Sequence, residues 1–103
     1  MFSNEIEQIK DPLWFKNFVK GKEILVSPPA TDRLDQGQRL IFTEETLRLP
    51  ILRDTPNFIA IQKNGRYTVY YKRKEHYLNI ILEVKGERSL QIISFMKKRI
   101  LPI

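Results

Sequence analysis

From residue 58 onward, apolar and polar residues alternate with the period of two that is typical of β-strands. The segments FIAIQ and RYTVYYKR flank Asn64 and Gly65, the dipeptide most favoured in the tight turn of a β-hairpin. HYLNIILEVK and SLQIISFM continue the pattern, with Gly86 between them. The pattern predicts four consecutive antiparallel strands, near residues 58–62, 66–73, 77–85 and 89–96.

The N-terminal third has the spacing and the boundary residues of helices. Asn4 and Glu7 fit a capping box, which predicts helix at the start of the chain. Asp11 as N-cap, Pro12 at the first helical position and Gly21 beyond the end predict a second helix. Its apolar stripe, which we expect in the core rather than in a ligand site, consists of Trp14, Phe15, Phe18 and Val19.

Residues 24–42 have no regular pattern, because two adjacent prolines and a glycine interrupt them, and they predict a long loop that contains Arg33 and Arg39. Thr43 fits the N-cap of a short helical turn that Pro50 should end or bend. Residues 1–103 are thus predicted to form a single α+β domain, with N-terminal helices packed on a four-stranded antiparallel sheet.

Alternation in the third strand assigns the two faces of the predicted sheet. One face is apolar, and the other is half polar and therefore accessible to a ligand. The apolar side carries Leu78, Ile80, Leu82 and Val84, and the half-polar side carries Tyr77, Asn79, Ile81 and Glu83.

The distribution of charge bears on function, because the net charge of +6 is confined to the C-terminal part. Residues 1–61 carry 8 Lys/Arg and 9 Asp/Glu, whereas residues 62–103 carry 10 and 3, a net of +7. A localised excess of this kind is typical of a surface that binds nucleic acid or another polyanion, although a solubilising surface has the same composition. The chain has no Cys, no apolar run long enough to span a bilayer and no signal-peptide pattern, so we expect a cytoplasmic protein without a membrane segment.

RNA cleavage without a metal uses the ribose 2′-OH as nucleophile and needs a proton acceptor, a proton donor and a cation near the phosphate. The predicted strands carry residues of these types, although a single His at a strand start is more often an ordinary polar residue. The candidate catalytic residues are Arg66, Lys72, His76 and Ser94, and the candidate nucleic-acid-binding residues are Tyr70, Arg73, Lys74, Lys97, Lys98 and Arg99. This chemistry requires no cofactor.

The run PNFIAIQKNGRYTVYYKR, followed by YLNIILEV and LQIISF, resembles the phage-borne branch of the barnase/EndoU/colicin/RelE-like nuclease superfamily over about 40 residues. By this resemblance Tyr70, Tyr71 and Lys72 stand in a Tyr-Tyr-Lys strand, and Ser94 stands at a Thr/Ser position of the last strand. The resemblance implies a RelE/barnase-like fold and a small metal-independent endoribonuclease. Relatives often have one or two histidines in a preceding helix, and DRLDQGQRLIFTEETL has none. The chain is then either inactive or dependent on Lys and Arg.

Two alternatives stay open. The segment IILEVK has the apolar-Glu-x-Lys form of metal-dependent nucleases, in which Glu83 would bind Mg²⁺ and Lys85 would orient water. A hard cation needs a second carboxylate, but Asn57 stands where such nucleases usually have Asp, which leaves Asp54 as a poorer candidate. A basic sheet with tyrosines can also bind single-stranded RNA without cutting it, or dock an acidic inhibitor or antitoxin protein.

Overall fold

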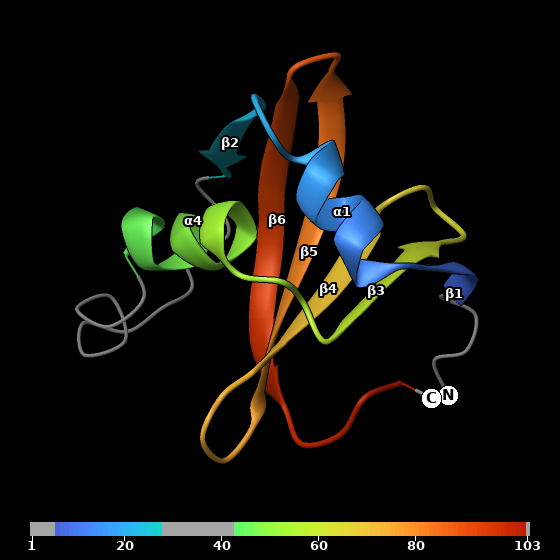
Figure 1. The fold of residues 1–103 in the computed structure, drawn as a ribbon, viewed down its shortest axis with the longest axis vertical. Helices are drawn as coiled ribbons and strands as arrows, with labels where there is room; N and C mark the ends of the chain where they lie inside the picture. The colour runs from blue at the N-terminus through green and yellow to red at the C-terminus, as the bar shows by residue number, and fades with distance from the viewer. Residues whose placement is uncertain (1–5, 28–42, 103) are drawn as a thin grey trace.

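A computed structural model describes residues 6–27 and 43–102. The described strands form one six-stranded sheet in the order β1-β3-β4-β5-β6-β2, and the ribbon in Figure 1 shows helices α1 and α4 in front of it. In chain order the elements are β1 (Ile6–Lys10), α1 (Pro12–Phe18), β2 (Glu23–Val26), α4 (Glu44–Arg53), β3 (Phe58–Gln62), β4 (Tyr67–Lys72), β5 (Tyr77–Gly86) and β6 (Ser89–Lys98).

The predicted fold class is wrong. The sheet has six strands rather than four, and it is mixed, because β2 runs parallel to β6 while the other pairs are antiparallel. The described residues include only two helices, of 7 and 10 residues, and the first strand precedes both of them. The molecule is therefore mostly sheet, and two N-terminal strands take part in it.

The four C-terminal strands form where the alternation predicts them, and consecutive strands pair antiparallel. Between β3 and β4, Gly65 has φ +87°, a left-handed conformation that glycine adopts without steric cost. The Asn64 side-chain oxygen accepts a hydrogen bond from the backbone N–H of Arg66 at 2.9 Å, which closes the turn. The hairpin is thus closed by local contacts, but the turn is not the type I′ turn that the Asn-Gly dipeptide predicts, because Asn64 does not have the positive φ which that turn requires.

Residues 6–10 form the edge strand β1 instead of the predicted helix. The strand pairs antiparallel with β3, and its register shifts between Ile6 and Gln8. This bulge sets Ile6 opposite Gln62 and Ile9 opposite Ala60, so both isoleucines point to the same face of the sheet. Apolar residues three positions apart usually indicate a helix, but here the bulge places both of them on one face of a strand. Asn4 of the predicted capping box lies outside the described residues.

Helix α1 begins as predicted. Asp11 is its N-cap and accepts a hydrogen bond from the backbone N–H of Leu13 at 2.9 Å, and Pro12 is its first residue. Residues 24–26 were predicted to be irregular, but together with Glu23 they form β2, because their backbone pairs with Ser89–Ile92 of β6. The rest of the predicted loop, residues 28–42 with Arg33 and Arg39, lies outside the described part of the chain.

Helix α4 is longer than the predicted turn. Thr43 caps it as predicted, with its hydroxyl accepting from the backbone N–H of Thr46 at 3.2 Å. The helix passes through Pro50, which is buried, and ends at Arg53, and the backbone N–H of Asp54 donates to the Pro50 carbonyl at 2.9 Å. Proline removes one helical donor, but packing of the buried side of α4 offsets that loss.

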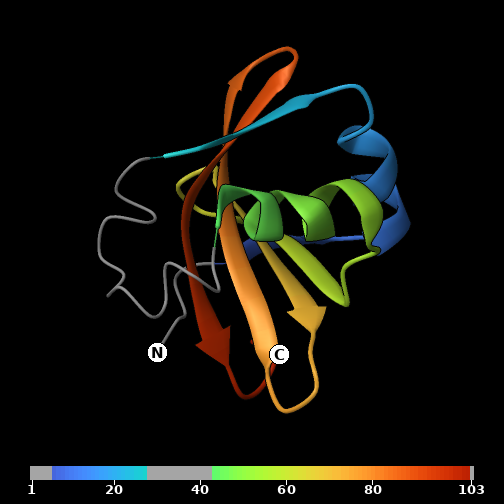
Figure 2. The same cartoon turned by 90° about the vertical axis from the view of Figure 1, so that its left-hand side faces the viewer.

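Both helices cover the same face of the sheet, as Figure 2 shows. The main core lies between them and that face, and residues of the four C-terminal strands, β2 and the helices contribute to it. Its largest fully buried side chains include Tyr71, Phe15, Leu47, Ile51 and Ile80. We call this the helix face, and we call the opposite side the pocket face. No helix within residues 6–27 and 43–102 is long and apolar enough to cross a bilayer.

Candidate functional site

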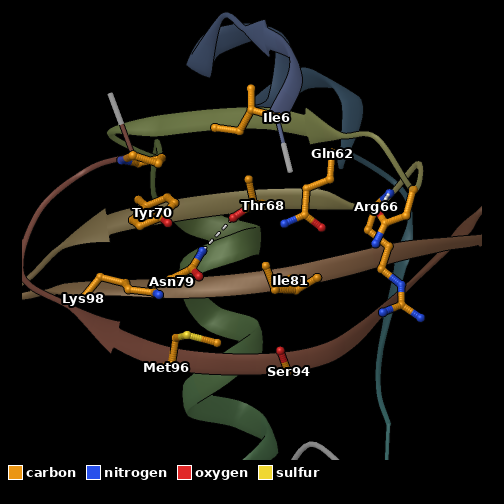
Figure 3. Close-up of a pocket in the computed structure, with 12 residues that line it drawn as sticks. Ile6, Gln62, Arg66, Thr68, Tyr70, Asn79, Ile81, Ser94, Met96 and Lys98 are labelled. Atoms are coloured by element: carbon orange, nitrogen blue, oxygen red, sulfur yellow. Dashed lines mark hydrogen bonds between the residues drawn. The ribbon is translucent and has the colours of Figure 1, made fainter. Parts of the chain in front are cut away.

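A pocket of about 430 Å³ lies on the pocket face, across the middle of the sheet. Figure 3 looks into it and shows side chains that rise from β3, β4, β5 and β6 toward the viewer, with Ile6 of β1 at its edge. Polar groups outnumber apolar side chains in its lining. The lining consists of Ile6, Gln62, Asn64, Arg66, Thr68, Tyr70, Asn79, Ile81, Ser94, Met96, Lys98 and Pro102.

Strand register determines which side chains meet in the pocket. Residues directly opposite each other on paired strands point to the same face. One row across the sheet joins Thr68, Ile81 and Ser94, and the next row joins Tyr70 and Asn79 before it reaches Met96. Ser94, which the sequence resemblance singles out, therefore shares the pocket with residues of two neighbouring strands.

The floor of the pocket is held by Asn79, a buried residue with 2% of its surface exposed. Its side-chain nitrogen donates to the Thr68 hydroxyl at 2.8 Å and to the Val69 carbonyl at 3.1 Å. The first of these bonds is drawn in Figure 3. Because both hydrogens of the amide are used, the orientation of the side chain is fixed. The sequence predicted an accessible residue here, and the structure buries it.

Tyr70 forms one wall and is almost fully buried. Its ring meets Phe58 and Tyr77 edge to face, with centroid distances of 5.7 and 6.4 Å. Burial raises the pKa of the Tyr70 phenol above its ordinary value of 10.0, and an interaction with the Thr68 hydroxyl opposes this rise. At neutral pH the phenol is therefore protonated and can serve as a hydrogen-bond donor, not as a base.

Arg66 stands at one end of the pocket, as Figure 3 shows. Its Nε lies 3.2 Å from Oε2 of Glu83, and Nζ of Lys85 lies 2.7 Å from Oε1 of the same carboxylate. Hydrogen bonds from Lys85 and then Arg66 lower the pKa of Glu83. The Glu83 carboxylate thus already has two cationic partners. Within the described residues no three His, Cys, Asp or Glu side chains group as a metal site.

Two lysines mark the other end. Lys72 lies opposite Tyr77, and Tyr77 lies opposite Lys98, so all three point to the pocket face. Nζ of Lys72 is 4.9 Å from the centre of the Tyr77 ring, and Lys98 lines the pocket. Neither lysine forms an ion pair with a described residue. The pocket therefore has Arg66 at one end and two ammonium groups, without carboxylate partners among the described residues, at the other.

The structure brings together four of the ten predicted site residues, because Arg66, Tyr70, Ser94 and Lys98 line the pocket. Lys72 adjoins it through Tyr77. The other five residues do not line it. His76 and Lys74 belong to the turn between β4 and β5, and Arg99 follows β6. Lys97 lies opposite the core residue Leu78 and so points to the helix face.

Arg73, the fifth of these residues, is engaged on the helix face. Its guanidinium lies 3.8 Å from the Asp54 carboxylate at the end of α4 and 5.8 Å from the centre of the Tyr71 ring. It also donates to the Lys72 carbonyl at 3.0 Å. These contacts connect the β4–β5 turn to α4, so Arg73 has a structural role whether or not it meets a ligand.

Sequence reasoning missed several lining residues. Thr68 could have been found, because it lies two positions from both Arg66 and Tyr70, and side chains two positions apart in a strand point to the same face. Asn79 was placed on the half-polar face but was not predicted as a site residue. Pro102 gave no such signal. It reaches the pocket because the chain turns back after β6, where the partly buried Leu101 packs against the cluster of Phe58, Ala60 and Tyr70.

Comparison of the chain with protein-family models, with curated proteins and with solved structures finds no match. The resemblance to the barnase/EndoU/colicin/RelE-like nucleases therefore stays a prediction from a few short sequence elements.

Proposed function

We propose that the pocket face binds single-stranded RNA and that the pocket holds one of its nucleotides. The observation that carries this proposal is the pair of lysines, Lys72 and Lys98, which stand without carboxylate partners among the described residues beside a polar pocket. They belong to the part of the chain that carries a net charge of +7. Ammonium groups of this kind attract phosphates, and the release of counterions from RNA drives such binding.

The lining supports a nucleotide as the ligand. Hydroxyl and amide groups from Ser94 and Gln62 can hydrogen-bond to a ribose or a base edge, while Ile81 and Met96 offer apolar contact. Cations at both ends suit a strand whose phosphates lie on either side of the bound nucleotide. Recognition of this type needs unpaired bases, which single-stranded RNA provides.

Cleavage is a second candidate, favoured by the placement of Ser94 in the same pocket as Arg66 and Lys98. In such a reaction the 2′-oxygen attacks phosphorus and loses its proton, and the 5′-oxygen leaves and gains one. The described residues supply the cations but no evident base in the pocket, since Tyr70 stays protonated and His76 is not among the lining residues. The geometry therefore supports binding better than cutting.

The test measures binding of a fluorescent single-stranded RNA by anisotropy at several salt concentrations. Changing Lys72 and Lys98 together to Ala should weaken binding about tenfold and reduce the slope of log affinity against log salt by about 1.4, because each phosphate contact contributes about 0.7. Arg53→Ala, an exposed cation of α4, is the control and should change little. Equal affinity of the double variant and the parent would contradict the proposal.

The same RNA, incubated with and without EDTA and run on a gel, decides between binding and cutting. Discrete products that persist in EDTA would identify a metal-independent ribonuclease, and products lost in EDTA a metal-dependent one. Intact RNA recovered from a stable complex would identify a binding module. If cutting occurs, His76→Gln should lower the cleavage rate strongly only if His76 is the base.

A further inference from the structure

Two lysines and two aromatic rings form a column on α1 and the segments beside it. Nζ of Lys10 lies 4.8 Å from the centre of the Trp14 ring, and Trp14 stacks on Phe18 with a centroid distance of 5.0 Å and an angle of 14°. Nζ of Lys22 lies 4.5 Å from the centre of the Phe18 ring. We call Lys10, Trp14, Phe18 and Lys22 the Trp14 column.

The Trp14 column lies behind one end of the pocket. Both of its rings contact the Tyr67 ring, whose centroid lies 6.2 Å from that of Trp14 and 5.5 Å from that of Phe18. Tyr67 points to the helix face, whereas its neighbours Arg66 and Thr68 line the pocket. The column and the Arg66 end of the pocket therefore lie on opposite faces at the start of β4. An RNA strand that reaches both must therefore pass around the β3–β4 turn.

Core packing accounts for only part of this arrangement. Trp14 and Phe18 pack against the core but are themselves only partly buried, and the adjacent Leu13 is 62% exposed. The two lysines lie over ring faces and form no ion pair with any described residue, although Lys22 also donates to the Glu87 carbonyl at 3.3 Å.

The charge of this segment suits an anionic partner. Residues 10–22 contain four lysines and a single acidic residue, Asp11, whose carboxylate accepts a hydrogen bond at the start of α1. The N-terminal part as a whole has a net charge of −1 over residues 1–61, so the positive charge is concentrated here. Partly exposed aromatic rings beside cations are the combination that holds single-stranded nucleic acid, with bases on the rings and phosphates on the ammonium groups.

We propose that the Trp14 column is a second RNA contact, which holds nucleotides of the strand that leaves the pocket past Arg66 and around the β3–β4 turn. One base stacks on Trp14 in the place of the Lys10 ammonium, which then pairs with a phosphate. Lys63, exposed in that turn, supplies a cation on the way. This inference rests on the proposed function of the pocket, and it extends the RNA site from one nucleotide to a longer segment on two faces.

The experiment compares two single-stranded RNAs, one of about 4 nucleotides that fills only the pocket and one of about 12 that can reach both sites. Trp14→Leu keeps an apolar side chain on the core but removes the stacking surface. It should weaken binding of the longer RNA about tenfold and leave the shorter RNA unaffected, since the loss of one base stack corresponds to a factor of roughly 5 to 150.

Lys10→Gln is the second variant, because a partly exposed surface residue can be changed without risk to the fold. It should weaken binding of the longer RNA severalfold, and Lys20→Gln, which removes the same charge from an exposed lysine that lies over no ring in the described structure, should have a smaller effect. Parental affinity of both Trp14→Leu and Lys10→Gln for the longer RNA would overturn the inference, as would an equal loss for both RNA lengths.

The proposed function can fail separately. If the parent binds neither RNA, or if the Lys72 and Lys98 double variant binds both as tightly as the parent, the pocket proposal is wrong and the second contact has no basis. If the double variant weakens both lengths while Trp14→Leu changes neither, only the second contact is wrong. Photochemical cross-linking of the longer RNA gives an independent readout, and an adduct on Trp14 is expected.

Discussion

Asn79 allows a quantitative test of how the pocket is held together. Asn79→Ala removes both hydrogen bonds of the side-chain amide, to Thr68 at 2.8 Å and to the Val69 carbonyl at 3.1 Å. Each bond contributes about 1 kcal/mol net, and the loss leaves buried acceptors without their donor, which adds a desolvation cost. We therefore expect the free energy of unfolding to fall by about 2–3 kcal/mol, a large part of the roughly 5–15 kcal/mol of a domain of this size.

Urea unfolding followed by circular dichroism measures this loss. With a denaturant slope of about 1–1.5 kcal/mol per molar urea, the midpoint should move down by about 2 M while the slope stays the same. Thr68→Val is nearly isosteric and removes only one of the two bonds, so it should cost about 1 kcal/mol. The double variant should then show a coupling of about 1 kcal/mol between the two positions.

Asn17→Ala is the matched control, because Asn17 is an exposed asparagine on α1, and it should change stability by no more than about 0.5 kcal/mol. The reasoning fails if Asn79→Ala unfolds within about 0.5 kcal/mol of the parent, or if the coupling with Thr68→Val is near zero, since the amide would then contribute nothing through these bonds.

Two further predictions concern buried and charged groups. The Tyr71 hydroxyl is buried and has no hydrogen-bond partner among the described residues, so Tyr71→Phe should raise stability by about 1 kcal/mol in urea unfolding, and a loss of that size would show that the hydroxyl has a partner. Glu83 has a pKa lowered from its ordinary 4.5 by Lys85 and Arg66, so its contribution to stability is present above about pH 4.5 and is lost as the pH falls through the lowered value. Glu83→Gln should therefore be less stable than the parent at pH 7 and equal to it at about pH 2, and a difference between the two that does not change with pH would contradict this reasoning.

The sequence predicted those parts of the fold that depend on neighbouring residues. The β3–β4 hairpin follows from Asn64 and Gly65, and the start of α1 follows from Asp11 and Pro12, because the atoms involved lie within a few positions of one another. β1 was missed because Asn4 and Glu7 fit a capping box, and because the sequence does not reveal the bulge that places Ile6 and Ile9 on one face of a strand. β2 was missed because its pairing depends on β6, far away along the chain.

In the candidate site, too, the sequence predicted what depends on residue type and missed what depends on contacts between distant residues. Residue type and the family resemblance selected Tyr70 and Ser94, and both line the pocket. The sequence could not show that Glu83 engages Arg66 or that Asp54 engages Arg73, because both ion pairs join residues of different elements. The alternation of side chains along β5 also could not show that Asn79 is buried, since burial depends on which residues the neighbouring strands place beside it. Residue types indicated the chemistry, and long-range packing decided which residues are available for it.

The parallel pairing of β2 with β6 has a consequence for the order in which the protein folds. Residues 23–26 are synthesised early, but their partners, residues 89–92, emerge from the ribosome only near the end of the described chain. The β4–β5 and β5–β6 hairpins can form first because their contacts are local, whereas β2 must wait for loop closure over some sixty residues. During that interval the backbone edge of β2 and the side chain of Ile24 have no partner in the sheet. Addition of β2 is therefore expected to be a late step of folding, and the nascent chain is most exposed to mispairing before it.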